Sequence, residues 1–313
     1  MRTLFIIFIM QLSFTSVAQH NFSKEFSLVS DNDLYTSIVR DRYYTNGLFL
    51  TYRTVKNDGS KYNPKKIKQY QIGQLMYTSV NPNLTNASLQ DRPFAGYLYG
   101  SYGLNWYYHT NTILATELQI GVIGPSAKGY ELQNFLHGLY NYPKPMGWRH
   151  QINNAFALNL NIKYLHNFSE ISNHYFDFSS YNNLKAGTIF TSLSSGLYSR
   201  VGLKKLQPFT NSVAFNSNLN HTAKSYDESF LFIKPMLSYA LYDATIEGSF
   251  LNNSNPVVFN VMPFYFLLEI GYRFYKKHFS YGYTYTYHTQ KAKSLNITKS
   301  NNYGSIYVGY YFN

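Results

Sequence analysis

The stretch that decides the fold class is FYFLLEIGYRFY, from Phe264 to Tyr275. In an extended strand, successive side chains point to opposite faces, and this stretch alternates along its whole length. One face would be apolar: Phe264, Phe266, Leu268, Ile270, Tyr272 and Phe274. The other face would carry mainly polar or small residues: Tyr265, Glu269, Gly271 and Arg273. Apolar residues toward lipid and polar residues toward a lumen are typical of a transmembrane β-barrel strand.

The same alternation recurs from one end of the chain to the other. The runs are residues 22–31, 45–55, 66–78, 96–110, 111–123, 149–166, 172–182, 188–201, 228–243, 263–275, 277–289 and 302–313. Bacterial single-chain barrels have an even number of strands, and this count comes to about 12. The sequence therefore predicts an all-β protein, an antiparallel transmembrane β-barrel, with one short helix in an extracellular loop.

Composition supports a barrel in a membrane. Of the 313 residues, 19% are aromatic and only 13% are charged, whereas soluble domains carry about 25% charged residues. The formal net charge is +12, but the lysines lie in turns at both ends of the expected strands and form no single basic face. This distribution excludes a nucleic-acid partner and favours contact with the phosphates of lipopolysaccharide and other outer-membrane lipids.

The N-terminus, MRTLFIIFIMQLSFTSVAQ, has the features of a secretory signal peptide. Arg2 is followed by a short apolar run, and Ser16-Val17-Ala18 offers a small-residue cleavage site. We expect residues 1–18 to be a signal peptide and residues 19–313 to form one barrel in the bacterial outer membrane. There are no cysteines, so disulfides cannot stabilise the secreted chain, whereas a closed barrel needs none.

One connection fits this strand count poorly. With both termini in the periplasm, residues 202–228 fall on the periplasmic side, where turns are short. The alternation pattern does not explain why this connection is so long.

One segment is predicted to contain a helix: Gly124 to Trp148, GPSAKGYELQNFLHGLYNYPKPMGW. An apolar face is expected at helical spacing: Leu132, Phe135, Leu136 and Leu139. Gln133 and His137 are four residues apart, so they project from a shared side of the helix. Such a helix either carries chemistry at His137 or only caps the barrel mouth with His137 in solvent.

Three other outer-loop segments carry polar groups. At the end of the first strand, Asp31, Asn32 and Asp33 offer oxygen ligands for a hard cation, or form an Asx turn. Thr45, in DRYYTNG at residues 41–47, can approach them across the first hairpin, although this motif could equally be a girdle tyrosine pair before a hairpin. Arg92 could pair with a lipid phosphate or form a structural ion pair.

Together these segments resemble the LpxR family of outer-membrane lipid A 3'-O-deacylases over nearly the whole mature chain. The matching motifs, in order, are Asn32-Asp33, DRYYTNG at 41–47, DRPFAGYLYG at 91–100, and GPSA with GxxxQNFLH at 124–137, followed by PKPMGW. The resemblance implies a twelve-stranded barrel that removes the 3'-linked acyloxyacyl chain, with its active site facing the outer leaflet. It also implies lipid A as the partner and Ca²⁺, or another divalent cation, as the cofactor, and we expect a monomer.

The resemblance also implies roles for individual residues. His137 matches the family's proposed general base, Asn32 and Asp33 match a pair needed for activity, and Thr45 matches a threonine of the same site. Asp33, with Asn32 beside it, is the expected metal ligand. An imidazole ordinarily titrates near pH ~6.5 and can accept a proton from water, and a cation can stabilise an oxyanion.

The sequence departs from the family at one position. Some members carry an active-site lysine in the second outer loop, where SVNPNLTNASLQ, residues 79–90, has none. We expect Arg92 or Lys128 to substitute in substrate binding, together with Gln133. Two other functions stay open: a non-enzymatic pore or structural barrel, and a serine-dependent phospholipase using Ser101 or Ser126.

Overall fold

The computed structural model describes residues 21–36, 42–60, 63–222, 224, 226–294 and 298–313. The expected signal peptide, residues 1–18, lies outside the described residues, as does Asp41 of the DRYYTNG motif. Within these ranges no helix is both long and apolar enough to cross a bilayer.

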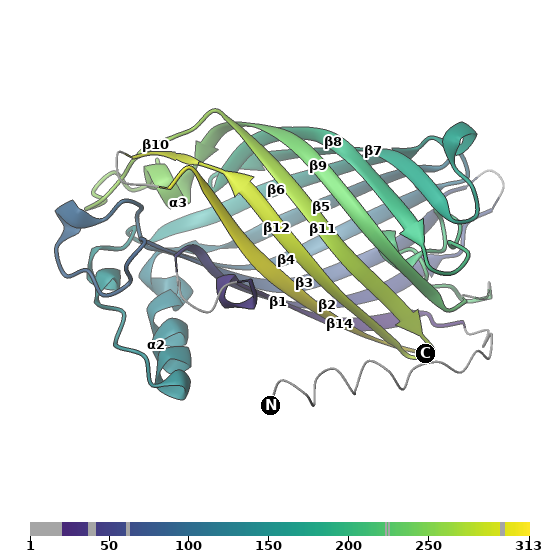
Figure 1. The fold of residues 1–313 in the computed structure, drawn as a ribbon, viewed down its shortest axis with the longest axis horizontal. Helices are drawn as coiled ribbons and strands as arrows, with labels where there is room; N and C mark the ends of the chain where they lie inside the picture. Colours follow the sequence, from purple (N-terminus) through teal and green to yellow (C-terminus); the bar gives the residue numbers. More distant parts are fainter. Residues whose placement is uncertain (1–20, 37–41, 61–62, 223, 225, 295–297) are drawn as a thin grey trace.

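The chain forms a closed antiparallel barrel, as the alternation predicts (Figure 1). Its strands, in chain order, are β1 (Lys24–Asn32), β2 (Tyr43–Asn57), β3 (Lys65–Thr78), β4 (Ala95–Tyr108), β5 (Thr112–Ile123), β6 (Ala155–Asn167), β7 (Phe176–Gly187), β8 (Phe190–Gly202), β9 (Glu228–Asp243), β11 (Phe264–Lys276), β12 (Phe279–Thr289) and β14 (Ser300–Phe312). The barrel closes where β1 pairs with β14, from Lys24 opposite Phe312 to Asn32 opposite Gly304. Closure leaves no unpaired sheet edge, which lipid could not satisfy.

The side chains lie on the faces that the pattern predicts. On β11, Phe264, Phe266 and Ile270 are exposed on the outer surface, where lipid would cover them. Glu269 points into the lumen and forms an ion pair of 2.6 Å with Lys234 of β9. A one-residue slip would turn every apolar side chain inward, so the outer apolar band fixes the register.

Two strand boundaries differ from the sequence prediction. The strand expected from residue 149 begins at Ala155, because Met146–His150 forms the 3-10 helix η4 with Trp148 buried. The hairpin between β7 and β8 is tighter than expected, because pairing continues to Lys185 opposite Ser192. Two further strands, β10 (Asn260–Val261) and β13 (Ala292–Lys293), make a small sheet at the barrel mouth.

The long connection between β8 and β9 folds into the periplasmic end of the barrel. Phe209, Val213 and Leu219 are buried in a cluster with side chains from strands all around the barrel. Residues 203–222, which include the 3-10 helix η6 (Val213–Phe215), therefore form a periplasmic plug. The length of this connection, which the strand pattern left unexplained, reflects a plug that fills one end of the lumen.

An ionic network fastens the periplasmic plug to the barrel wall. Arg200 of β8 is almost completely buried and forms ion pairs with Asp177 of β7 and Glu228 of β9. The Arg200 guanidinium and the Glu228 carboxylate both bond to the hydroxyl of Ser212 in the plug. Buried charges need such complete pairing, so the network holds the plug in one position.

Candidate functional site

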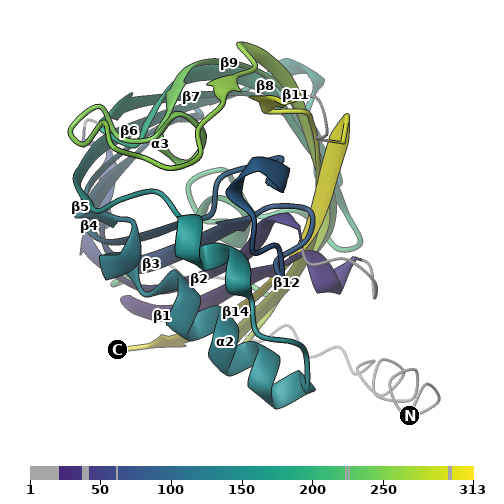
Figure 2. The same ribbon diagram turned by 90° about the vertical axis from the view of Figure 1, so that its left-hand side faces the viewer.

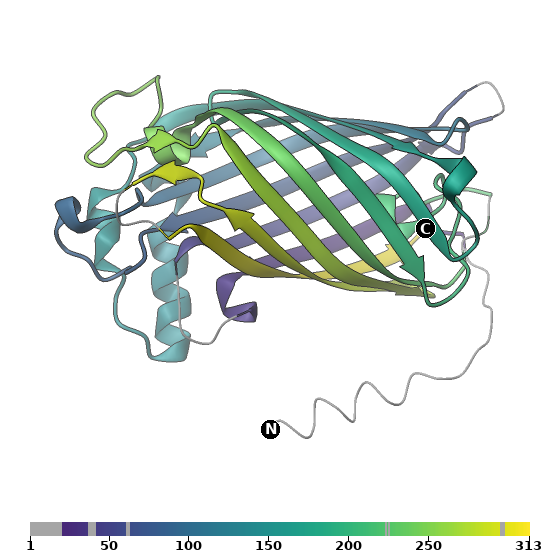
Figure 3. The same ribbon diagram turned by 45° about the horizontal axis from the view of Figure 1, so that its top comes forward.

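The outer-loop elements gather at the barrel mouth, at the end opposite the C-terminus (Figure 1). Helix α2 (Gly129–Tyr140) follows β5 and projects outward from the barrel wall. The 3-10 helix η1 (Asp33–Tyr35), the short purple helical turn, lies outside the wall on the same side. Both elements lie near the mouth on this side of the barrel in all three views, with space between their ribbons (Figures 1, 2 and 3). A site between them would face the outer leaflet of the membrane.

The start of α2 is held tightly against the barrel. Lys128 takes a left-handed conformation, with φ of 58°, which turns the chain from η3 (Pro125–Ala127) into the helix. A Cβ at Gly129 would overlap the ring of Trp148, so glycine permits this close packing. At the other end, Asn141 is also left-handed and its N–H bonds to the carbonyl of His137. The helix predicted from the sequence therefore begins and ends next to left-handed residues, and the bond from Asn141 caps its C-terminal end.

His137 is fixed in orientation by the segment that follows α2. Its side chain is 6% exposed, and Nδ1 lies 2.6 Å from the carbonyl oxygen of Pro143. A carbonyl only accepts, so Nδ1 carries the proton in the neutral ring and Nε2 holds the lone pair. The ring of Tyr142 packs edge-on against the imidazole. Pro143, which follows the helix, thus also selects the tautomer whose lone pair is on Nε2.

Gln133 lies on the buried side of α2 with His137, as their spacing predicts. It is 2% exposed, and its Oε1 accepts a hydrogen bond of 2.5 Å from Nε1 of Trp148. The expected apolar face is only partly buried: Leu132 packs on a small core, while Phe135 and Leu139 are 61% and 63% exposed. The helix therefore turns a polar pair inward and part of its apolar face outward, toward the membrane side.

The tip of the first hairpin is a compact polar turn. Asn32 caps η1, with its Oδ1 accepting from the N–H of Leu34 at 2.7 Å, which is an Asx turn. Asp33 is 3% exposed, and its carboxylate accepts from the N–H of Arg42 at 2.6 Å. Asn32 pairs with Asn46 in the sheet, so the expected approach of the two motifs across the hairpin is confirmed.

Thr45 lies beside this turn at an irregularity in the pairing of β2 with β3. Its hydroxyl is 2.9 Å from that of Thr78, so the side chain leans toward β3. Tyr43 and Tyr44 are both buried and are not girdle residues. Tyr43, with φ of 63°, donates to Asp91 and accepts from the N–H of Thr298, so it joins three outer loops. This role could not be predicted from the sequence, because nothing in the sequence indicates a left-handed conformation at Tyr43.

Arg92 and Lys128, the other residues predicted to bind substrate, have hydrogen-bond and ion-pair partners of their own. Arg92 faces the lumen, where it donates to Thr245 at 2.8 Å and stacks on Tyr77. Lys128 is exposed and pairs with Glu131 of its own helix at 3.0 Å. Neither residue is shown beside His137, so their assignment to substrate binding stays a prediction. The main cavity, of about 500 Å³, occupies the lumen and is lined by Arg92 but not by His137, Asn32, Asp33 or Thr45.

The hairpin tip offers hard oxygen donors that fit a divalent cation. The described residues contain no group of three histidine or acidic side chains that could hold a metal. A site there would combine the Asp33 carboxylate and the Asn32 amide oxygen with backbone carbonyls, water and substrate oxygens. Such mixed oxygen sets suit Ca²⁺, which binds weakly where the protein supplies few charges.

The closed antiparallel barrel, with its apolar side chains exposed on the outer surface, defines an integral β-barrel of the outer membrane. The profile of the family described as "Outer membrane protein LpxR" matches residues 4–312. The chain belongs to the LpxR family, and membership implies that it is a lipid A 3'-O-deacylase, a hydrolase of the outer membrane.

Comparison with solved structures shows the same fold. LpxR from Salmonella typhimurium has a TM-score of 0.74 and 19% sequence identity, over 92% of this chain and 100% of that chain. The β domain of the Bordetella autotransporter BrkA scores 0.48 at 9% identity, over 94% of this chain and 99% of that one. That likeness reflects only the general barrel shape. No curated protein matches the sequence.

Proposed function

We propose that the chain hydrolyses the ester of the 3'-linked acyloxyacyl chain of lipid A with a water molecule activated by His137. The observation that carries this proposal is the bond between His137 Nδ1 and the Pro143 carbonyl, on a helix at the same end of the barrel as the Asn32–Asp33 turn. It presents Nε2 as the proton acceptor at the height of the outer leaflet, where the ester lies.

In the proposed reaction, His137 acts first as a general base and then as a general acid. Nε2 of His137 takes a proton from water as the water oxygen attacks the ester carbonyl carbon. The bond from the carbonyl carbon to the sugar oxygen then breaks, and the imidazolium returns its proton to that oxygen. Asp33 and Asn32 would hold Ca²⁺, which supplies positive charge for the oxyanion when it is bound. Thr45 and Gln133 would complete the site; buried hydrogen bonds hold Thr45 to Thr78 and Gln133 to Trp148.

The exposed apolar part of α2 fits a lipid substrate. Phe135 and Leu139 face away from the barrel wall, and Tyr142 is exposed just beyond the helix. Exposed apolar side chains beside a membrane can contact acyl chains, whose burial is favourable. They would form one wall of the path that the acyloxyacyl chain takes to His137.

The two rival functions lack structural support. A pore needs an open lumen, whereas the periplasmic plug fills the periplasmic end of this one. A serine lipase needs a serine hydroxyl bonded to a histidine, and the described residues show no such pair. Ser101 instead donates to Glu117 inside the lumen at 2.7 Å.

Metal removal tests the proposal directly. We expect the purified barrel to lose its deacylase activity on lipid A micelles in EDTA and to regain it when excess Ca²⁺ is added. The physical reason is that few protein charges hold the cation, so binding is reversible. The measurement is release of the fatty acid, followed by mass spectrometry. Retained activity in EDTA, combined with complete loss on treatment with a serine-directed reagent, would exclude the proposed mechanism.

A further inference from the structure

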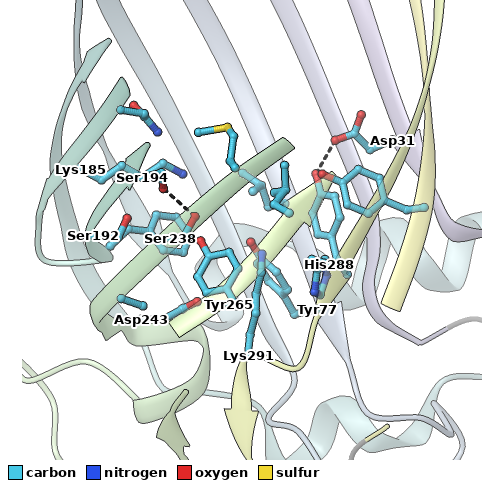
Figure 4. Close-up of a pocket in the computed structure, with 18 of the residues that line it drawn as sticks. Asp31, Tyr77, Lys185, Ser192, Ser194, Ser238, Asp243, Tyr265, His288 and Lys291 are labelled. Carbon is cyan, nitrogen blue, oxygen red and sulfur yellow. Dashed lines mark hydrogen bonds between the residues drawn. The ribbon is translucent and has the colours of Figure 1, made fainter. Parts of the chain in front are cut away.

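The lumen between the mouth and the periplasmic plug holds a polar cavity that the deacylase mechanism does not use. Its volume is about 500 Å³, within the range that accommodates small-molecule ligands. Figure 4 shows lysine, serine, tyrosine and aspartate side chains that converge on it from several strands and from the loop after β12. A pocket lined by such polar groups can bind a polar ligand.

Three lysines line this cavity without a carboxylate partner. Lys163 lies opposite Asn183, and Lys185 opposite Asn161, so the two lysines are diagonal neighbours on the lumen face. Lys291 enters from the loop after β12. Within the described part of the chain, no ion pair joins any of the three to an acid. By contrast, Lys234 in the same cavity is paired with Glu269 at 2.6 Å.

Aromatic rings hold two of these lysines in place. The ammonium of Lys185 lies 5.0 Å from the centre of the Phe190 ring, and that of Lys291 lies 4.8 Å from the centre of the Tyr265 ring. Such contacts are favourable but leave the N–H donors without anionic acceptors. Lys185 is also repelled by Lys291 and Lys163. The three positive charges are therefore close enough to interact within the cavity.

The cavity wall also carries four carboxylates: Glu269 pairs with Lys234, and Asp31 and Glu117 accept hydrogen bonds from neutral hydroxyls. Asp243 lies nearby, but one of its oxygens already accepts from the N–H and the hydroxyl of Thr245, at 2.9 and 2.6 Å. Burial lowers the pKa of Lys291 to about 8, against the opposing effect of Asp243, and the Arg92 charge lowers it further. At neutral pH, Lys291 therefore remains mostly protonated but would gain from a bound anion.

We propose that this cavity is an anion-binding site in which Lys163, Lys185 and Lys291 hold a phosphoryl group. Several ammonium donors around one space suit a compact multivalent anion. The hydroxyl of Ser192 adds a neutral donor, and the bonded pair Ser194 and Ser238 adds another. The phosphoryl group can belong to inorganic phosphate or to a phosphorylated saccharide that enters through the mouth. This site is separate from the His137 site, and the inference does not rest on the deacylase mechanism.

Calorimetry on the full-length barrel in detergent tests the site. We expect saturable binding of inorganic phosphate or of glucose 6-phosphate, and no binding of glucose. The double variant Lys185→Gln/Lys291→Gln should weaken that binding at least about tenfold, since each charged hydrogen bond contributes strongly. The matched control is Lys293→Gln, which removes an exposed charge two residues from Lys291 and should leave binding unchanged.

Comparing the affinities of inorganic phosphate and glucose 6-phosphate distinguishes the two possible sources of the phosphoryl group. Tighter binding of glucose 6-phosphate than of phosphate indicates a phosphorylated saccharide, and the reverse order indicates the free ion. Binding of neither probe, or equal binding by the double variant and the wild type, overturns the proposal.

A second measurement uses only the wild-type protein, so it does not depend on folding of the variants. Acetylation of each lysine by acetic anhydride is quantified by peptide mass spectrometry, with phosphate or with chloride at equal ionic strength. We expect phosphate to slow acetylation of Lys185 and Lys291 and to leave Lys293 unchanged. Equal acetylation of the two lumen lysines in both salts would contradict the site.

Discussion

The variant His137→Ala is expected to deacylate lipid A about 10²–10⁴-fold more slowly than the wild type, the usual contribution of a positioned general base. The methyl group of alanine cannot accept the proton of the attacking water. The imidazole is buried and oriented through Nδ1, so no neighbouring side chain on α2 can take its place without moving. The measurement is the initial rate of fatty acid release from lipid A micelles at saturating Ca²⁺.

A matched control distinguishes loss of the base from damage to the mouth. His150 lies in η4, and its Nε2 contacts the carbonyl of Thr85 outside the proposed site. His150→Ala should keep most of the activity. Both variants should show the heat-modifiable gel mobility that is typical of a folded barrel. A folded His137→Ala protein with at least half the wild-type rate would remove His137 from the mechanism.

The variant Arg200→Met is expected to lower the free energy of unfolding by about 3–5 kcal/mol, the cost of leaving buried charges without their partner. Arg200 is 1% exposed and is the only cation bonded to both Asp177 and Glu228 among the described residues. Methionine fills much of the same volume, so the loss reports mainly on the charges. The measurement is urea unfolding in detergent, followed by tryptophan fluorescence.

An exposed lysine in the periplasmic plug provides the control for this prediction. Lys204→Met also removes one positive charge from this end, but the side chain is solvent-exposed and should change stability little. Equal stabilities of the two variants would show that the Arg200 network does not fasten the plug.

Much of the barrel could be predicted from the sequence, because the alternation that identifies each strand lies within that strand. Each strand must present apolar residues to lipid at every second position, and FYFLLEIGYRFY shows this directly. The periplasmic plug could not be predicted in the same way. QPFTNSVAFNSNLN, residues 207–220, has the composition of a loop, and its burial depends on strands that are distant in sequence.

The candidate site was predictable to the extent that it depends on helical spacing and strand pairing. The shared side of Gln133 and His137 follows from a spacing of four residues, and the Asn32–Asn46 pair follows from the hairpin. The direction of the apolar face of α2 did not follow, because Phe135 and Leu139 face outward where lipid replaces a protein core. The contact of Tyr43 with Asp91 depends on a left-handed backbone that tertiary packing imposes.

Mass spectrometry of lipid A from producing cells tests most directly whether the hairpin tip and helix α2 form one hydrolytic site. Cells that make the wild-type barrel should yield lipid A lighter by one acyloxyacyl group. Cells that make equal amounts of folded Asp33→Ala or His137→Ala barrel should yield unmodified lipid A. Lipid A that loses the same mass in either variant as in the wild type would show that the substituted residue is not part of the hydrolytic site.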